Sequence, residues 1–301
     1  MGIASPDKVL VFGGYGQVGE ALAVTAEAAG HDPAAIVQLG RDDVDVTDEV
    51  SVEESVQDHA ARTVINCAVF QPVDLCETNP AEAFRVNATA AGVLARACKR
   101  SATRMVHLST DYVFGGPRRV PFRETDLPAP QSVYAASKLA GEHLVLAASE
   151  MHSVVRTSAV YGTARPGHGT SPFIERMLER ARQGAETRVV NDQVVSPTYT
   201  HDLAAAIWSL LACGACGLFH VANKGQATWF EVAEVAFTAV GARRCLRPTT
   251  ASDFGAPAKR SAYTALDNAA LRDLGLSELP HWRDALGRYF AANHPDLKLT
   301  I

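Results

Sequence analysis

The chain has 301 residues, of which 47% are hydrophobic and 20% charged, and its formal net charge is −5. This composition fits an ordinary globular protein with one large domain or two modest ones. The net negative charge does not favour binding to nucleic acid or to an anionic membrane. No apolar run reaches the length of a membrane span and no secretory pattern is present, so we expect a cytoplasmic protein with no nucleic-acid or membrane partner.

The cysteines do not form a disulfide framework. Six are scattered along the chain, which fits a reducing compartment. Only Cys213 and Cys216 form a C-x-x-C pair, and no second Cys or His pair stands at zinc spacing. We interpret the pair as small-residue packing at the end of a helix and predict no metal site.

A glycine turn follows the first predicted strand. Residues 8–12 are a short apolar run, residues 13–19 read Gly-Gly-Tyr-Gly-Gln-Val-Gly, and an alanine-rich helix is expected to residue 29. Gly13 would permit the tight turn, Gly16 the approach of backbone amides to a pyrophosphate, and Gly19 close packing of helix on strand. Strand, glycine turn and helix together predict a dinucleotide site.

The next segment bears on which dinucleotide is used. A predicted strand at residues 35–39 would end near the adenosine ribose, and Gly40-Arg41 follows it. An arginine there can pair with a 2′-phosphate, which favours NADPH, although Asp42 and Asp43 follow and a solvated surface arginine is the alternative. We interpret residues 45–48 as a short strand edge where Asp45 could meet the adenine.

Residues 63–68 are predicted as another buried strand, and the following helix is expected to run to about residue 99. Asn79 is its predicted N-cap and Pro80 opens the first turn. Asn87 is a polar residue on the apolar stripe of this helix. It either bonds a neighbouring backbone near the active site or is a satisfied core asparagine.

The centre of the chain carries the candidate chemistry. An apolar run at residues 105–108 predicts a strand that delivers Ser109 and Thr110 to its end. Tyr134 and Lys138 are four apart on a predicted helix that continues to about residue 148, so they share one face. A cation near a phenol favours phenolate, which predicts proton transfer near neutral pH. Taken alone, the pair is better explained as a surface pair, because Y-x-x-x-K occurs by chance on many helices.

The remaining pattern completes an α/β fold. Residues 154–157 are predicted as a strand, and the alternation of strands and helices predicts a Rossmann-type doubly wound parallel sheet with a smaller C-terminal α/β substrate-binding domain. We place the NADP(H)-binding domain at residues 1–160, with residues 186–222 returning to it, and the substrate-binding domain mainly at residues 161–301. Further helices are expected at 172–183, 201–212, 228–240, 267–274 and 281–293, and extended segments at 188–191 and 218–221.

The chain resembles the extended short-chain dehydrogenase/reductases, and within them the dTDP-4-dehydrorhamnose reductase family, over nearly its whole length. The motifs that carry the resemblance are residues 13–19, Asp45-Val-Thr-Asp48, Val73-Asp74 with Cys76-Glu77, Ser109-Thr-Asp-Tyr-Val-Phe114, Tyr134-Ala-Ala-Ser-Lys138, Arg156-Thr-Ser158 with Val160-Tyr-Gly162, Asn191-Asp-Gln193 with Ser196-Pro-Thr-Tyr199, Thr228-Trp229 and Ala258-Lys-Arg260.

The resemblance implies NADPH- or NADH-dependent reduction of the C4 ketone of a dTDP-4-keto-6-deoxyhexose by a monomer or homodimer. Tyr134 would donate the proton, Lys138 would hold the nicotinamide ribose and lower the pKa of the tyrosine, and Thr110 would bond the carbonyl oxygen. The cofactor residues would be Gly13, Tyr15, Gly16, Gln17, Val18, Gly19, Arg41, Asp45, Val46, Cys67, Ala68 and Lys138. The substrate residues would be Asp111, Phe70, Ala159, Phe173, Gln193 and Arg260.

The chain departs from that pattern mainly at expected substrate contacts. Ala159 stands where the family usually has tryptophan, Phe70 and Gln71 replace an aromatic and a threonine, and Val195 replaces a glycine. We therefore hypothesise an altered sugar substrate. The alternatives are a nucleotide-sugar epimerase and a non-catalytic NADP-binding regulatory subunit that resembles the methionine adenosyltransferase beta subunit. A 4,6-dehydratase is disfavoured because Tyr112 follows Asp111 where a glutamate is needed.

Overall fold

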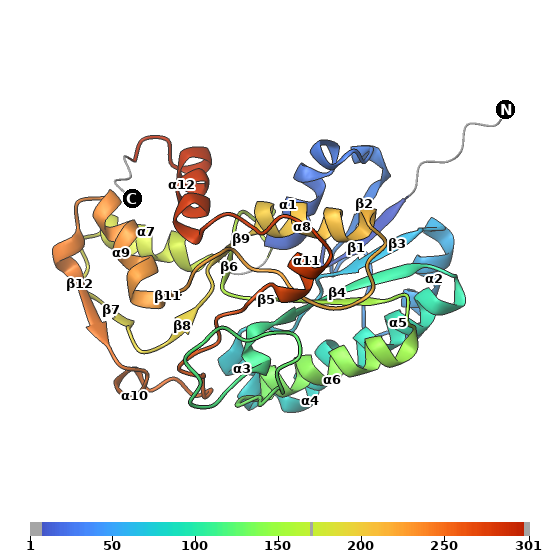
Figure 1. Cartoon of the computed structure of the whole chain (residues 1–301), viewed down its shortest axis with the longest axis horizontal. Helices are drawn as coiled ribbons and strands as arrows, with labels where there is room; N and C mark the ends of the chain where they lie inside the picture. Colours follow the sequence, from blue (N-terminus) through green and yellow to red (C-terminus); the bar gives the residue numbers. More distant parts are fainter. Residues whose placement is uncertain (1–7, 169–170, 298–301) are drawn as a thin grey trace.

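A six-stranded parallel sheet forms the centre of the computed structural model, which describes residues 8–168 and 171–297 (Figure 1). The strand order is β10-β5-β4-β3-β1-β2, and all neighbouring strands are parallel. The strands are β1 (Val9–Phe12), β2 (Ile36–Leu39), β3 (Thr63–Asn66), β4 (Arg104–Thr110), β5 (Ser153–Thr157) and β10 (Gly217–His220). Their continuous apolar runs suit strands covered on both faces. The predicted doubly wound parallel sheet is confirmed.

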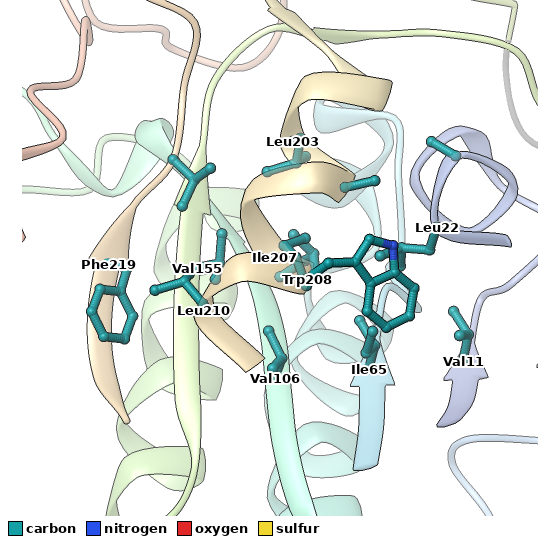
Figure 2. Close-up of a cluster of buried hydrophobic side chains, with 14 of the residues drawn as sticks. Val11, Leu22, Ile65, Val106, Val155, Leu203, Ile207, Trp208, Leu210 and Phe219 are labelled. Atoms are coloured by element: carbon teal, nitrogen blue, oxygen red, sulfur yellow. The ribbon is translucent and has the colours of Figure 1, made fainter. Parts of the chain in front are cut away.

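Helices cover both faces of this sheet. One face packs against α1 (Gln17–Thr25), α8 (Thr200–Ala212) and α11 (Ala269–Asp273), and the other against α2 (Glu49–His59), α5 (Ala91–Arg100) and α6 (Val133–Ala148). Figure 2 shows Ile207 and Trp208 of α8 over the apolar side chains of the strands. Before α5 come α3 (Val73–Thr78), α4 (Pro80–Phe84) and a π-helical turn, Arg85–Ala90.

A second group of elements has its own apolar core. It contains α7 (Phe173–Arg182), α9 (Trp229–Ala239) and α12 (Trp282–Asn293). Around them lie three two-stranded sheets, formed by β6 (Val160–Tyr161) with β9 (Thr198–Tyr199), β8 (Val194–Val195) with β11 (Ala227–Thr228), and β7 (Thr187–Val190) with β12 (Leu246–Thr249). A short helix, α10 (Ala251–Phe254), follows β12. The division into two domains at residue 160 stays a prediction.

Short 3-10 turns connect several of these elements. They are Glu27–Ala29, Pro33–Ala35, Asp111–Val113 and Arg243–Cys245. The turn at Asp111–Val113 directly continues β4, and Thr110 accepts a hydrogen bond from the Tyr112 N–H at its start (3.2 Å). This turn redirects the chain at the carboxyl end of the sheet, where the candidate catalytic residues lie.

Several local predictions are wrong. Residues 45–48 form a turn rather than a strand edge: the Asp45 carboxylate accepts from Thr47, and Asp48 caps α2 through the Val50 N–H. The predicted N-cap position of Asn79 is confirmed at the start of α4, but its side chain donates to the Leu75 carbonyl (3.0 Å) and makes no capping bond. Local hydrogen bonds of these short polar side chains override the predicted patterns.

The C-x-x-C pair was also misinterpreted. Cys213 and Cys216 are exposed, and Ala215 between them is the buried residue. The turn after α8 places the intervening alanine, not the thiols, against the core. Within residues 8–168 and 171–297, no group of three or more His, Cys, Asp or Glu side chains is arranged to hold a metal ion. No helix in those ranges is long and apolar enough to cross a bilayer.

Candidate active site

The glycine turn lies at the carboxyl edge of the sheet between β1 and α1. Gly13 has a φ of +69°, and a Cβ there would lie 2.8 Å from the backbone nitrogen of Ala68 and the carbonyl carbon of Cys67. A Cβ on Gly19 would lie 2.2 Å from the Gly14 oxygen, so α1 packs on the turn only because position 19 is glycine. The structure thus brings the predicted turn and the Cys67–Ala68 segment together. Both follow the carboxyl ends of parallel strands, where ligands bind in sheets of this kind.

The segment after β2 is more solvated than its predicted role implies. Arg41, Asp43 and Asp45 are exposed. The Asp43 carboxylate accepts the Gly40 N–H (2.7 Å), and this bond, followed by one from Tyr15, lowers the pKa of Asp43. The Asp43 carboxylate therefore bonds the turn that contains it, whereas the Arg41 side chain is exposed to solvent. Val46 is half-buried in the turn that precedes α2.

An arginine from the segment after β6 packs on the glycine turn, which the sequence did not predict. The guanidinium of Arg165 lies 3.7 Å from the centroid of the Tyr15 ring. It also pairs with Glu20 (3.2 Å) and bonds Gln38 (3.2 Å), while the ring of His168 meets Tyr15 edge-on at 5.0 Å. This contact joins residues 165–168 to the predicted cofactor turn across more than a hundred positions.

Thr110 and Tyr134 meet at the end of β4. Ser132 caps α6 by accepting the Ala135 N–H, which sets Tyr134 in the first turn of the helix. The Tyr134 hydroxyl accepts a hydrogen bond from Gln71 (3.2 Å), and a further bond with Thr110 influences its pKa. Both residues are buried. The predicted hydroxyl pair therefore does share one site.

The expected effect of Lys138 on the phenol is not what the structure shows. Burial raises the pKa of Tyr134 above its ordinary value, and the hydrogen bonds from Gln71 and Thr110 only oppose this shift. Lys138 instead donates to the Leu108 carbonyl (2.6 Å) and lies 3.3 Å from Nε2 of His107. The prediction of a lowered tyrosine pKa was wrong in direction because it left out desolvation.

Asp111 lies behind Thr110 and is 2% exposed. Its carboxylate accepts from Ser158 (2.8 Å) and Thr264 (2.5 Å) and contacts the Thr110 hydroxyl (3.2 Å). Burial outweighs these bonds and raises the pKa of Asp111 to about 6. The carboxylate connects β4 to two later segments of the chain, and its predicted contact with substrate stays a prediction.

Phe70 lies beside Tyr134, and Arg260 is bound to α3. Phe70 packs in the apolar cluster that contains Tyr134, and its N–H donates to Asn87 Oδ1 (2.8 Å). Asn87 thus bonds the backbone of the segment after β3, and because it is buried with partners for both amide atoms, it is also a satisfied core asparagine, so the structure agrees with both predicted alternatives. Arg260 forms a bidentate pair with Asp74 (3.0 Å for each bond), which joins the late Ala258-Lys-Arg260 segment to α3.

The other predicted substrate residues are more dispersed. Phe173 opens α7 and packs against Trp229 at a ring distance of 4.7 Å. Gln193 is buried beside β8. Ala159 lies between β5 and β6 with a φ of +43°, a conformation that is unusual for a residue with a Cβ. Among the described residues, no hydrogen bond, ion pair or ring contact joins these three side chains to Tyr134, and their roles stay predictions.

Four side chains near the site were missed or given no role. Gln71 bonds Tyr134, His107 lies beside Lys138, and Glu142 forms a buried pair with Arg156 (2.6 Å) one turn after Lys138. A signal was present for His107, a polar residue inside the apolar run of β4, and for Glu142, a charge on a helix face that packs on the sheet.

A family model matches nearly the whole chain. The model of the family described as RmlD substrate binding domain matches residues 7–294. The chain belongs to this family. A dTDP-4-dehydrorhamnose reductase of Mycobacterium tuberculosis is 40% identical over 292 residues, which cover 95% of this chain and 93% of that protein.

Two further relatives agree in length and fold. A dTDP-4-keto-6-deoxy-D-glucose reductase of Streptomyces niveus is 35% identical, with 96% of this chain and 99% of that protein covered. The crystal structure of dTDP-4-dehydrorhamnose reductase from Bacillus anthracis in complex with NADP superposes with a TM-score of 0.89 at 32% identity, covering 96% of this chain and all of the other. The family resemblance drawn from the motifs is confirmed.

Proposed function

We propose that this chain reduces the C4 ketone of a dTDP-4-keto-6-deoxyhexose, with NADPH or NADH as hydride donor. One observation carries the proposal: the buried hydroxyls of Thr110 and Tyr134 meet at the carboxyl edge of the sheet, one helical turn from Lys138. The names of the relatives from Mycobacterium tuberculosis and Streptomyces niveus support this reaction class. A cytoplasmic location and a monomer or homodimer remain part of the proposal.

The residues of the glycine turn fit a dinucleotide. The N-terminus of α1 follows Gly16 directly, and its amides can face a pyrophosphate. A Cβ on Gly16 would lie 3.3 Å from the Gly13 oxygen, and Oε1 of Gln17 is buried with no hydrogen-bond partner among the described residues. An unpartnered buried oxygen in the turn is the kind of group that a bound ligand satisfies. When bound, the reduced nicotinamide supplies the hydride.

The chain itself would supply orientation and the proton. The Thr110 hydroxyl is proposed to donate to the ketone oxygen as negative charge develops there, and Tyr134 to transfer its proton to that oxygen. A raised tyrosine pKa keeps the phenol protonated at neutral pH, which is the form a proton donor needs. Lys138 would hold the nicotinamide ribose from the next turn of α6.

The sugar would be an altered one. Ala159 stands where the family usually has tryptophan, so the site lacks one stacking surface. Asp111, Phe70, Phe173, Gln193 and Arg260 are the other residues proposed to contact the nucleotide sugar. We infer a substrate within the class of dTDP-4-keto-6-deoxyhexoses that differs from the rhamnose precursor.

The decisive experiment is NADPH and NADH oxidation with a panel of dTDP-4-keto-6-deoxyhexoses. Tyr134→Phe is expected to lower kcat by at least about a hundredfold while the Kd for NADPH stays within about twofold. Tyr289→Phe, which changes a buried tyrosine of the second core, serves as the matched control and should turn over normally. Tight NADPH binding without turnover of any keto-sugar would refute the proposed reductase activity and favour a regulatory subunit. Unchanged turnover in Tyr134→Phe would refute the role of Tyr134 as proton donor.

A further inference from the structure

A chain of buried polar groups runs from the segment after β3 to Lys138. The Ala68 N–H donates to Oδ1 of Asn66 at 3.0 Å. Nδ2 of Asn66 lies 3.1 Å from Nδ1 of His107, and Nε2 of His107 lies 3.3 Å from Nζ of Lys138. All three side chains are buried, and His107 has no exposed surface. Each polar atom therefore depends on its neighbour in the chain for a partner.

The first bond determines the proton position on His107. A backbone N–H can only donate, so the Asn66 atom that faces Ala68 is the amide oxygen. The atom that faces His107 is therefore the amide nitrogen, which has hydrogens and no acceptor. Nδ1 of His107 must accept, and a neutral imidazole then carries its hydrogen on Nε2. The ring is neutral because burial, and next the charge of Lys138, lowers the pKa of His107 well below its ordinary value.

This hydrogen points at Nζ of Lys138. An ammonium group has three donors and no acceptor, so its contact with Nε2–H would oppose two donors. A neutral amine can accept from Nε2–H with its lone pair while one of its own N–H groups donates to the Leu108 carbonyl (2.6 Å). This contact is therefore favourable for the amine form of the lysine and unfavourable for the ammonium form.

The surroundings of Lys138 agree with that form. The other titratable groups that act on it are Glu142, on the same face of α6, and Cys67, in the segment after β3. Both would raise the pKa of Lys138, yet burial outweighs them and lowers it to about 8. Protonated and neutral lysine are thus both accessible close to neutral pH.

We propose that His107 is a positioning residue that donates a hydrogen bond from Nε2 to the amine form of Lys138 and thereby favours the amine over the ammonium. The inference rests on the proposed reduction. There, the oxygen at C4 takes the proton of Tyr134, and the resulting phenolate must regain a proton, which the Lys138 ammonium one turn further along α6 can supply. The lysine becomes the amine that His107 stabilises, and a proton from water restores the ammonium.

The tautomer of His107 is measured by NMR of the full chain labelled with 15N-histidine. The chain has ten histidines, and the His107 signals are assigned by their loss in His107→Gln. We expect a neutral ring protonated on Nε2 between about pH 6 and about pH 9. A ring protonated on Nδ1, or an imidazolium at neutral pH, would overturn the proposal.

The second measurement follows the titration of the Lys138 ammonium by lysine side-chain NMR. His107→Leu removes the donor that favours the amine, and one hydrogen bond of about 1 kcal/mol should raise the midpoint by about 0.7 of a pH unit. His107→Gln keeps an N–H donor and should stay close to the wild-type midpoint. His152→Leu, a buried histidine bonded to the Ala95 carbonyl, is the control and should leave the midpoint unchanged.

An identical midpoint in wild type and His107→Leu would refute the role of His107. Neither measurement requires turnover of a keto-sugar, so the proposal about His107 and the proposed function can fail separately. A purely structural role would predict loss of stability in His107→Leu with no change in the lysine titration. If His107→Leu does not fold, the wild-type tautomer and the His107→Gln midpoint still decide the question.

Discussion

The buried pair between Glu142 and Arg156 gives the sharpest prediction of stability. The Glu142 carboxylate accepts from Nε and Nη2 of Arg156 (2.9 and 2.6 Å) and from the Ser109 hydroxyl (2.5 Å). The two side chains are 2% and 3% exposed, and Nη1 of Arg156 has no partner among the described residues. Glu142→Gln keeps the shape but leaves the guanidinium charge uncompensated, which should lower the free energy of unfolding by about 3–5 kcal/mol.

Urea unfolding followed by circular dichroism measures this loss. The control is Glu82→Gln, whose carboxylate pairs with Arg85 on the surface and should cost less than about 1 kcal/mol. Combining Glu142→Gln with Arg156→Met should recover part of the loss, because no charge then remains buried. If Glu142→Gln costs no more than the surface control, the reasoning from burial is refuted.

Two further predictions concern Asp111 and the glycine turn. The pKa of Asp111 is raised from 3.8 to about 6, so its contribution to stability is complete below about pH 4 and is lost as pH rises through 6. The difference in unfolding free energy between wild type and Asp111→Asn should therefore change with pH. The wild-type value should fall by roughly 3 kcal/mol relative to the variant between about pH 4 and about pH 7. If the unfolding free energies of the two proteins change with pH in parallel, the prediction is contradicted. Gly19→Ala, whose Cβ would lie 2.2 Å from the Gly14 oxygen, should weaken NADPH binding at least about tenfold in a fluorescence titration. Gly16→Ala, with 3.3 Å to the Gly13 oxygen, should perturb the fold less, and equal stability of the two variants would contradict the packing argument.

The main sheet could be predicted because its local signals and its tertiary role agree. The run at β1 is apolar throughout, as a strand covered on both faces must be, and a glycine turn with a helix follows directly. The spacing of Tyr134 and Lys138 likewise fixes their common helix face without any knowledge of the sheet.

Other features depend on partners distant in the sequence. Strands β6, β8, β9 and β11 have two residues each, too few for a periodic pattern. The buried carboxylate of Asp111 takes a hydrogen bond from Thr264, 153 positions away. The pKa of Tyr134 rises because burial removes the phenol from water. The spacing of charged residues along a helix does not reveal that burial.

The orientation of Lys138 is a similar case. Its ammonium group was expected to act on the phenol, but Nζ bonds the carbonyl of Leu108 and lies beside His107, about 30 positions earlier. Only the pairing of β3 with β4 brings Asn66 beside His107, and no single-segment pattern contains that information.

The packing of α8 on α1 has a consequence for how the chain folds during synthesis. Trp208 of α8 donates to Thr25 across 183 positions, and its ring covers apolar side chains of the early strands (Figure 2). At about 5–20 residues per second, α8 leaves the ribosome on the order of 10 to 40 s after α1. Until then the apolar face of β1 and β3 is covered by α1 but not by α8, so the nascent chain passes through an interval in which chaperone binding and aggregation compete with completion of the sheet.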